Sequence, residues 1–133
     1  MSEPRSLPEP SPEWAEWWDA TRHRRLLVQQ CARCGRYQHY PRALCIHCGH
    51  AELAYREAAG TGTIYSFTVV HRAPVPTAPA APYAVALVRL AEGPVVLTNV
   101  VAADLEALVC DAPVTLAWEP LADGRSLPVF APA

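Results

Sequence analysis

Four cysteines have the residue type and spacing needed to bind a metal ion. They form two motifs, Cys31-Ala-Arg-Cys34-Gly35 and Cys45-Ile-His-Cys48-Gly49, and residues 35–44 separate the second cysteine from the third. The two-residue gap lets both thiolates of a motif face the same ion, and the glycine allows the tight turn that follows. Four thiolates at about 2.3 Å complete a closed tetrahedral shell around Zn²⁺ and leave no position for a catalytic water. The sequence therefore predicts a structural metal bound by Cys31, Cys34, Cys45 and Cys48.

The same thiolates suit two other kinds of chemistry. A single Cys-x-x-Cys pair would serve as a redox dithiol, but two pairs that both end in glycine favour a metal. Iron in a rubredoxin-like site would use the same four ligands, so the sequence leaves zinc and iron open. Since the ligand set is already complete, three nearby histidines are expected to be surface or supporting side chains: His39, His47 and His50.

No other group of residues forms a recognisable active site. The sequence lacks a Gly-x-Ser-x-Gly elbow, a Walker loop and a zinc-protease helix. His71 and Arg72 end a predicted strand, but no carboxylate stands at a suitable spacing, which favours solvated strand-end residues. Cys110 follows apolar residues and is expected to be a small buried side chain. We therefore predict no catalytic residues.

The elements before and around the cysteines are predicted from caps and periodicity. Residues 1–10 are polar and rich in proline and should be a disordered lead-in. A helical segment, residues 11–28, should start at Ser11, which can cap it, with Pro12 in the first turn. Spacing of three and four residues places three tryptophans on one helical face. The zinc ribbon should occupy residues 29–58.

Residues 59–133 are predicted to be an OB-fold barrel. Segments rich in β-branched and aromatic residues suggest strands at 61–71, 83–90 and 95–101, then a short helix at 104–109, then strands at 114–119 and 127–130. Three strands, a helix and two strands match a five-stranded OB-fold, in which a helix links the third and fourth strands. The predicted fold class is mainly β with a short N-terminal helix, a rubredoxin-like ribbon and this barrel.

The composition excludes several classes of protein. The chain has 133 residues, 51% of them hydrophobic, which suffices for a core and argues against global disorder. No apolar stretch is long enough to span a bilayer, and the polar N-terminus lacks a secretory h-region, so we expect a cytoplasmic protein. The net charge of −2 gives no general attraction to nucleic acid or membrane. Basic residues nevertheless gather between Arg22 and Arg42, and no acid occurs from Ala20 to Ala51.

The sequence resembles one family over roughly residues 13–131. The resemblance lies in the run LLVQQCARCGRYQHYPRALCIHCG, in GTGTIYSFTVVHRAP, in PYAVALVRLAEGPVVLTNV and in LPVF near the C-terminus. It is similar to the thiolase-associated family that joins a rubredoxin-like zinc ribbon to an OB-fold. Two positions depart from that family: Ile46 stands where proline is usual, and Asp111 where glycine is common. Aspartate tolerates positive φ better than most residues, so neither departure threatens the resemblance.

The resemblance implies a non-catalytic accessory subunit. Members of the family partner thiolases, aldolases of the thiolase superfamily or acyl-CoA hydratases, some of them in degradation of the steroid side chain. Because thiolase-like enzymes are typically dimers, we expect a symmetric heterotetramer with acyl-CoA near the interface. Arginine suits phosphate, and exposed tryptophan suits protein interfaces. The expected contacts to the partner or to CoA are Trp14, Trp17, Trp18, Arg22, Arg25, Arg42, His71 and Arg72.

Two other functions remain open from the sequence. Zinc ribbons and OB-folds also bind single-stranded nucleic acid, and Tyr65 and Phe67 alternate so that bases could stack on one strand face. The acidic net charge argues against this alternative. Solvated arginines and tryptophans packed in the chain's own core would explain the same residues without any partner. An independent small enzyme is the third possibility, and turnover by the isolated chain would indicate it.

Overall fold

The computed structural model describes residues 5–133. The first part of the predicted disordered lead-in, residues 1–4, lies outside the described residues. Residues 5–10 form neither helix nor strand. Arg5 nevertheless makes an ion pair with Glu119 and a hydrogen bond to Asn99, so this segment contacts the second half of the chain.

The N-terminal helix is shorter than predicted. A 3-10 turn, η1 (Pro12–Trp14), leads into α1 (Ala15–Thr21), and the Ser11 side chain makes no capping hydrogen bond. The helix ends because Arg24 adopts a left-handed conformation with φ 55°. There Arg24 N donates to Thr21 O and Arg25 N to Ala20 O, which satisfies the last carbonyls. None of the helices within residues 5–133 combines the length and apolar character needed to cross a membrane.

The ribbon contains a three-stranded antiparallel sheet. Its strands are β1 (Leu27–Cys31), β2 (Tyr37–Gln38) and β3 (Leu53–Glu57), in the order β2-β1-β3. Chain reversals after each cysteine pair use glycine at positive φ, 74° at Gly35 and 79° at Gly49. L-residues with a Cβ rarely adopt this conformation, which explains why both motifs end in glycine.

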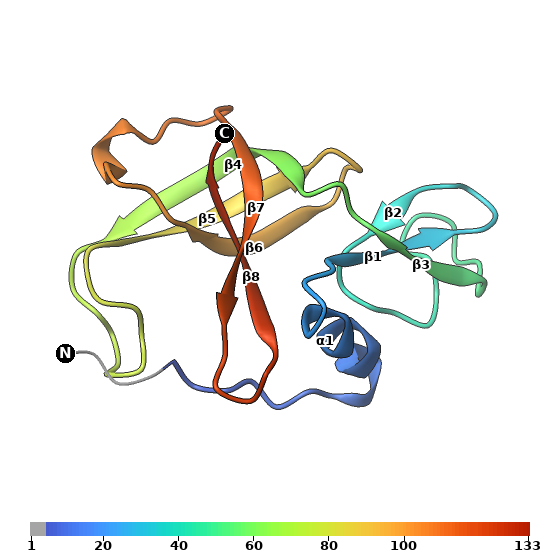
Figure 1. Ribbon diagram of the computed structural model, residues 1–133. Coiled ribbons are helices and arrows are strands. Elements are labelled where there is room, and N and C mark those ends of the chain that lie inside the picture. The colour runs from blue at the N-terminus through green and yellow to red at the C-terminus, as the bar shows by residue number, and fades with distance from the viewer. Residues whose placement is uncertain (1–4) are drawn as a thin grey trace.

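The second half is a closed five-stranded barrel with the order β4-β5-β6-β8-β7. Figure 1 shows it beside the ribbon, with α1 below the link between them. Its one short helix is a 3-10 turn, η2 (Leu105–Ala107), between the third and fourth barrel strands. The mainly β fold class is therefore confirmed. The barrel strands are β4 (Thr61–Val70), β5 (Tyr83–Leu90), β6 (Val95–Val100), β7 (Pro113–Pro120) and β8 (Ser126–Pro132).

Glycine begins the barrel for a steric reason. A Cβ on Gly62 would lie 2.5 Å from the backbone oxygen of Arg89, so β4 and β5 can approach only if that residue is glycine. Asp111 has φ 68°, and its amide donates to Ile64 O. A positive φ at residue 111 explains why glycine is common at this position in the family that the sequence resembles. Aspartate also tolerates positive φ.

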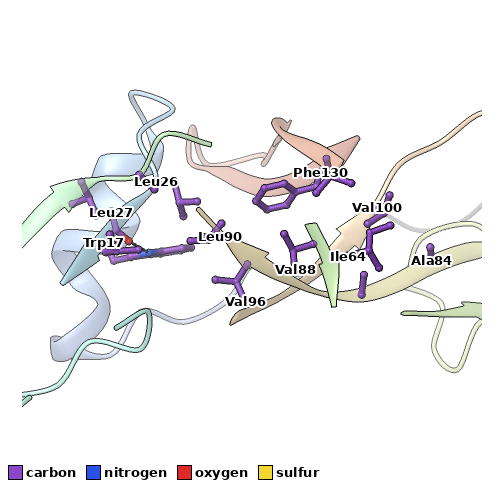
Figure 2. Close-up of a cluster of buried hydrophobic side chains, with 14 of the residues drawn as sticks. Trp17, Leu26, Leu27, Ile64, Ala84, Val88, Leu90, Val96, Val100 and Phe130 are labelled. Carbon is purple, nitrogen blue, oxygen red and sulfur yellow. Dashed lines mark hydrogen bonds between the residues drawn. The ribbon is translucent and has the colours of Figure 1, made fainter. Parts of the chain in front are cut away.

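One apolar core runs from the helix into the barrel. Figure 2 shows Trp17, Leu26 and Leu27 continuing through Leu90 and Val96 to the barrel interior. Fully buried side chains at its centre include Ile64, Val88 and Phe130, each 0% exposed. Alternate residues of β5 are buried, as expected for strands with one face on the core. The ribbon and the barrel are thus packed together through the helix.

Candidate metal centre and adjoining surfaces

The four cysteines converge as their spacing predicts. Their Sγ atoms all lie within 4.8 Å of one another. The Sγ atoms of Cys31 and Cys48 are 3.6 Å apart, and those of Cys34 and Cys45 are 3.7 Å apart. A disulfide would need about 2.05 Å, whereas a tetrahedral ion with bonds of about 2.3 Å would separate its sulfurs by about 3.8 Å. The geometry is therefore that of a four-sulfur metal site.

Backbone amides favour the thiolate form of the first cysteine in each pair. The Cys34 amide, helped by that of Arg33, lowers the pKa of the Cys31 thiol. Burial raises the pKa of Cys45, but hydrogen bonds from the amides of Cys48 and His47 and from the neighbouring thiols of Cys34 and Cys48 together lower that pKa to about 6. These amides stabilise negative charge on sulfur, and thiolates are the form that binds metal.

Two buried glutamines position the segment before the second cysteine pair. Gln29 and Gln38 face each other on β1 and β2, and Gln38 Nε2 donates to Gln29 Oε1 at 2.8 Å. Gln29 Oε1 also accepts from Arg42 N, and Gln38 Oε1 accepts from Ile46 N, each at 2.9 Å. These residues were missed from the sequence because polar residues in a short strand ordinarily face solvent. The sequence feature that could have indicated them is their position close to the Cys-x-x-Cys motifs.

An aromatic cluster joins the helix to the ribbon. Trp17 lies with its ring centroid 5.1 Å from Trp14 and 4.8 Å from Trp18, in edge-to-face geometry. His39 and Tyr40, from the segment after β2, complete the cluster. Aromatic pairs in this arrangement contribute about 0.5–1.5 kcal/mol each beyond their buried area. The cluster fixes the orientation of α1 against the metal-binding module.

His39 is a half-buried member of this cluster. Burial lowers its pKa to about 4, and its Nδ1 is buried without a hydrogen-bond partner within residues 5–133. The sequence suggested a surface or supporting side chain near the metal, whereas the structure places the neutral ring among tryptophans. A histidine between a strand and a Tyr-Pro pair gives no clear sequence signal for burial.

The three tryptophans differ in their exposure. Trp17 is 4% exposed and donates from Nε1 to Leu27 O, so it belongs to the chain's own core. Trp14 and Trp18 are partly buried against that core. Arg125 lies over the Trp18 ring at 4.8 Å. The expectation that all three tryptophans face a partner does not hold for Trp17, because the helix uses it to pack on the ribbon and barrel.

The expected contact residues with polar side chains do not form one site. Arg22 donates to Asp123 O at 2.7 Å, and Arg25 lies 3.4 Å from a Glu57 carboxylate oxygen, so both make contacts within the chain. Arg42 is exposed on the ribbon. His71 and Arg72 are exposed after β4, whose end lies on the far side of the barrel from the ribbon in Figure 1.

Two further sequence expectations are corrected in the barrel and its loops. The register of β4 against β5 shifts between Ile64 and Ser66, so Phe67 returns to the core side while Tyr65 remains 53% exposed. The two aromatic rings therefore do not share a stacking face. Cys110 is exposed, not buried.

Two hollows lie where the ribbon meets the barrel. The first, about 550 Å³, lies between the aromatic cluster and barrel residues that include Leu97 and Val75. The second, about 680 Å³, lies between the ribbon and residues 92–95 and is lined by Arg36 and Arg42. His39 and Tyr40 line both hollows, so the two form one continuous surface across the junction.

Comparisons with known families match both modules. Residues 18–54 match the model of the ChsH2 rubredoxin-like zinc ribbon domain, and residues 55–119 match that of the ChsH2 C-terminal OB-fold domain. A chain in a solved structure, "Ltp2-ChsH2(DUF35) aldolase", is 40% identical with a TM-score of 0.85, and the match covers 95% of this chain and 98% of that chain. A DUF35-family protein from Sulfolobus solfataricus has a TM-score of 0.63 at 18% identity, over 80% of this chain and 78% of that chain, which shows the fold alone.

Two curated relatives are longer proteins. A probable enoyl-CoA hydratase alpha subunit from Thermomonospora curvata is 43% identical over 119 residues, 90% of this chain and 37% of the relative. A DUF35 domain-containing scaffold protein from Methanocaldococcus jannaschii is 33% identical over 69 residues, 51% of this chain and 49% of the relative. The matched segments therefore cover less than half of either curated relative.

Proposed function

This chain belongs to the ChsH2 family of proteins that join a rubredoxin-like zinc ribbon to an OB-fold, and on that basis we propose that it is a non-catalytic accessory subunit of a thiolase-superfamily enzyme acting on acyl-CoA substrates. The observation that carries this proposal is the match to the ChsH2(DUF35) chain of an aldolase structure over 98% of that chain. The name of one curated relative, a scaffold protein, supports a non-catalytic role, and that of the other, an enoyl-CoA hydratase subunit, supports a place in an acyl-CoA enzyme complex.

The metal in this proposal is a structural zinc. Four sulfurs with separations of 3.6 and 3.7 Å suit a tetrahedral ion, and the thiolate-favouring amides suit a divalent cation. Zinc bound by Cys31, Cys34, Cys45 and Cys48 would cross-link the two ends of the ribbon and supply no catalytic water. Metal analysis of the purified protein tests this, and iron in place of zinc would contradict the assignment.

The partner in this proposal is a thiolase or a retro-aldol lyase, with an acyl-CoA hydratase as the alternative, and it has its own catalytic residues. The accessory chain would support the acyl-CoA entrance of that enzyme, with two copies of each subunit in a symmetric assembly. Steroid side-chain CoA thioesters are the proposed substrate class. The nucleic-acid alternative loses support because the register shift in β4 separates Tyr65 from Phe67.

Affinity isolation from the native host tests the proposed function. Tagged chain should retain a thiolase, aldolase or hydratase, identified by mass spectrometry, whose acyl-CoA activity is then assayed. A matched Cys45→Ser chain should retain much less of it, since the ribbon loses its metal. Recovery of nucleic acid or ribonucleoproteins in place of such an enzyme would contradict the proposal.

A further inference from the structure

The junction between ribbon and barrel presents an apolar surface that residues 5–133 leave exposed. Tyr40 is 48% exposed at its centre, between Ile46 on the ribbon side and Leu97 on the barrel side, which are 65% and 63% exposed. Val75, from the β4–β5 loop, is 52% exposed beside the first hollow. We call these four residues, with Arg36 and Arg42, the junction surface. Large apolar side chains clustered around hollows are typical of interaction sites.

The ribbon side of the junction surface is positively charged. Arg36 and Arg42 line the second hollow, and neither has a salt-bridge partner among residues 5–133, although Arg42 lies near enough to Glu13 to help Ser11 lower the pKa of that carboxyl. Glu92 is the one acid that lines this hollow, and its Oε2 accepts from Ala59 N. No acid occurs from Ala20 to Ala51, so a partner with carboxylates on its surface would complement Arg36 and Arg42 on this side.

The first hollow is lined mostly by apolar side chains. Trp17 Nε1 donates to Leu27 O and Thr98 Oγ1 donates to Pro128 O, so these two lining groups are already used, whereas His39 Nδ1 is buried without a partner within residues 5–133. Asn99 Nδ2 donates to Ala84 O. A projecting aliphatic or aromatic side chain would gain buried area here without displacing the hydrogen bonds of Trp17, Thr98 and Asn99.

We propose that the junction surface is the docking site for the partner enzyme, which inserts an apolar side chain into the first hollow and places carboxylates against Arg36 and Arg42. This inference rests on the proposed function and adds the location and chemistry of the contact. A protein is the occupant that fits because the surface spans two modules and combines a central tyrosine, exposed aliphatic residues and unpaired arginines. Tyrosine and arginine are among the residues enriched in interface hot spots.

The proposal also explains why binding of the partner would depend on the metal. Tyr40 and Ile46 lie on the ribbon, whereas Leu97 lies on β6 of the barrel. The two halves hold a fixed separation only while the ribbon is folded around its ion and packed on the aromatic cluster. A single partner that contacts both halves would therefore bind the metal-loaded chain and not a chain with an unfolded ribbon.

Site-specific photocrosslinking tests the location. A photoreactive phenylalanine analogue is placed at Tyr40 or Leu97, and at Tyr65 or Val109 as controls, which are 53% and 59% exposed and line neither hollow. In the complex isolated from the host, Tyr40 and Leu97 should crosslink to the acyl-CoA enzyme and the controls should not. Crosslinks from the controls alone, or crosslinks from Tyr40 to nucleic acid, would overturn the proposal.

Charge reversal tests the chemistry in the same complex. Arg36→Glu with Arg42→Glu should weaken binding at least about tenfold, and rising salt should weaken wild-type binding. Arg24→Glu with Arg89→Glu changes the net charge equally away from both hollows and should alter affinity by less than about twofold. Equal affinity for both double variants would overturn the docking site while leaving the proposed function intact. If wild-type chain retains no acyl-CoA enzyme, the proposed function and the docking site both fail.

Discussion

The ribbon and the barrel are stabilised by different means. The barrel closes five strands around side chains such as Ile64, Val88 and Phe130, each fully buried. The ribbon has three short strands, and its interior combines cysteine sulfurs, a pair of glutamines and few buried apolar side chains, such as Val28. A module with so little apolar interior depends on its metal, because small domains rarely bury enough surface to fold alone. We therefore expect loss of the metal to unfold the ribbon, and truncation of a core side chain to lower the stability of the barrel.

The aromatic cluster and α1 couple these two modules. Trp17 donates to Leu27 O at the start of β1, while Thr21 Oγ1 accepts from Ser126 N on β8. Thr21 is 0% exposed, so this contact lies in a dry interface. The ribbon is therefore held against the barrel by the helix, and loss of the metal should affect the junction before it affects the barrel strands.

Loss of a metal ligand should have the largest effect. Cys45→Ser should abolish stoichiometric metal binding and unfold the ribbon, since structural zinc contributes on the order of 10 kcal/mol to such modules. Hydrogen exchange measured residue by residue should show amides of β1 to β3 becoming unprotected while those of β5 and β6 stay protected. The exposed Cys110→Ser is the matched control and should change neither metal content nor exchange.

A core truncation should give the opposite pattern. Phe130→Ala removes a fully buried ring from β8 and should cost about 3–5 kcal/mol in the free energy of unfolding. Denaturant unfolding measures that loss, and the remaining folded protein should still bind one metal per chain. Phe67→Ala, at a partly buried position, should cost less. If Phe130→Ala removed the metal without lowering barrel stability, the two modules would not differ as described.

The glutamine pair tests the polar interior of the ribbon. Gln38→Leu leaves the amide of Ile46 without its acceptor and breaks the bond to Gln29, which should destabilise the ribbon by about 2–3 kcal/mol. The readout is faster release of metal to a chelator. Gln30→Leu is a control with the same substitution at a side chain whose hydrogen bond to Gly35 O is exposed. Equal release rates for the two variants would show that the buried pair does not position the second motif.

The junction should respond to acid through His39. Its pKa is lowered to about 4 in the folded chain from an ordinary value of 6.5. Between these values the unfolded chain binds a proton that the folded chain does not, so stability is present above pH 6.5 and is lost as pH falls toward 4. The slope attributable to His39 approaches 1.4 kcal/mol per pH unit. His39→Phe should flatten the stability profile in this window, and His23→Phe, at an exposed position, should keep the wild-type slope.

The smallest effect should come from the end of α1. Arg24→Gly relieves a left-handed conformation at φ 55° and should raise the free energy of unfolding by about 0.5–1 kcal/mol. Thermal unfolding of the metal-loaded protein measures this gain. Arg24→Ala keeps a Cβ at the same φ and should show no comparable gain, so an equal gain from both would rule out backbone strain as the cause.

The sequence predicted the features that depend on local spacing. The cysteine motifs and the order of barrel strands follow from short repeated patterns, and the structure contains both. Features set by tertiary packing were missed: the place of His39 in the aromatic cluster, the burial of the glutamine pair, and the end of α1 at Thr21, after which Arg24 takes a conformation usual for glycine. The register shift beside Tyr65 was also missed, because the alternating pattern assumes a regular strand. One extra residue moves every later side chain to the opposite face of the strand.

The most direct test of the account is reconstitution of activity with purified components. The enzyme recovered with this chain is separated from it and assayed on acyl-CoA thioesters alone, with metal-loaded wild-type chain, and with Cys45→Ser chain. The account predicts that turnover depends on the metal-loaded chain, saturates at one chain per enzyme subunit, and is not restored by Cys45→Ser. Full activity of the enzyme alone, or turnover by this chain alone, would contradict the assignment of a non-catalytic accessory subunit.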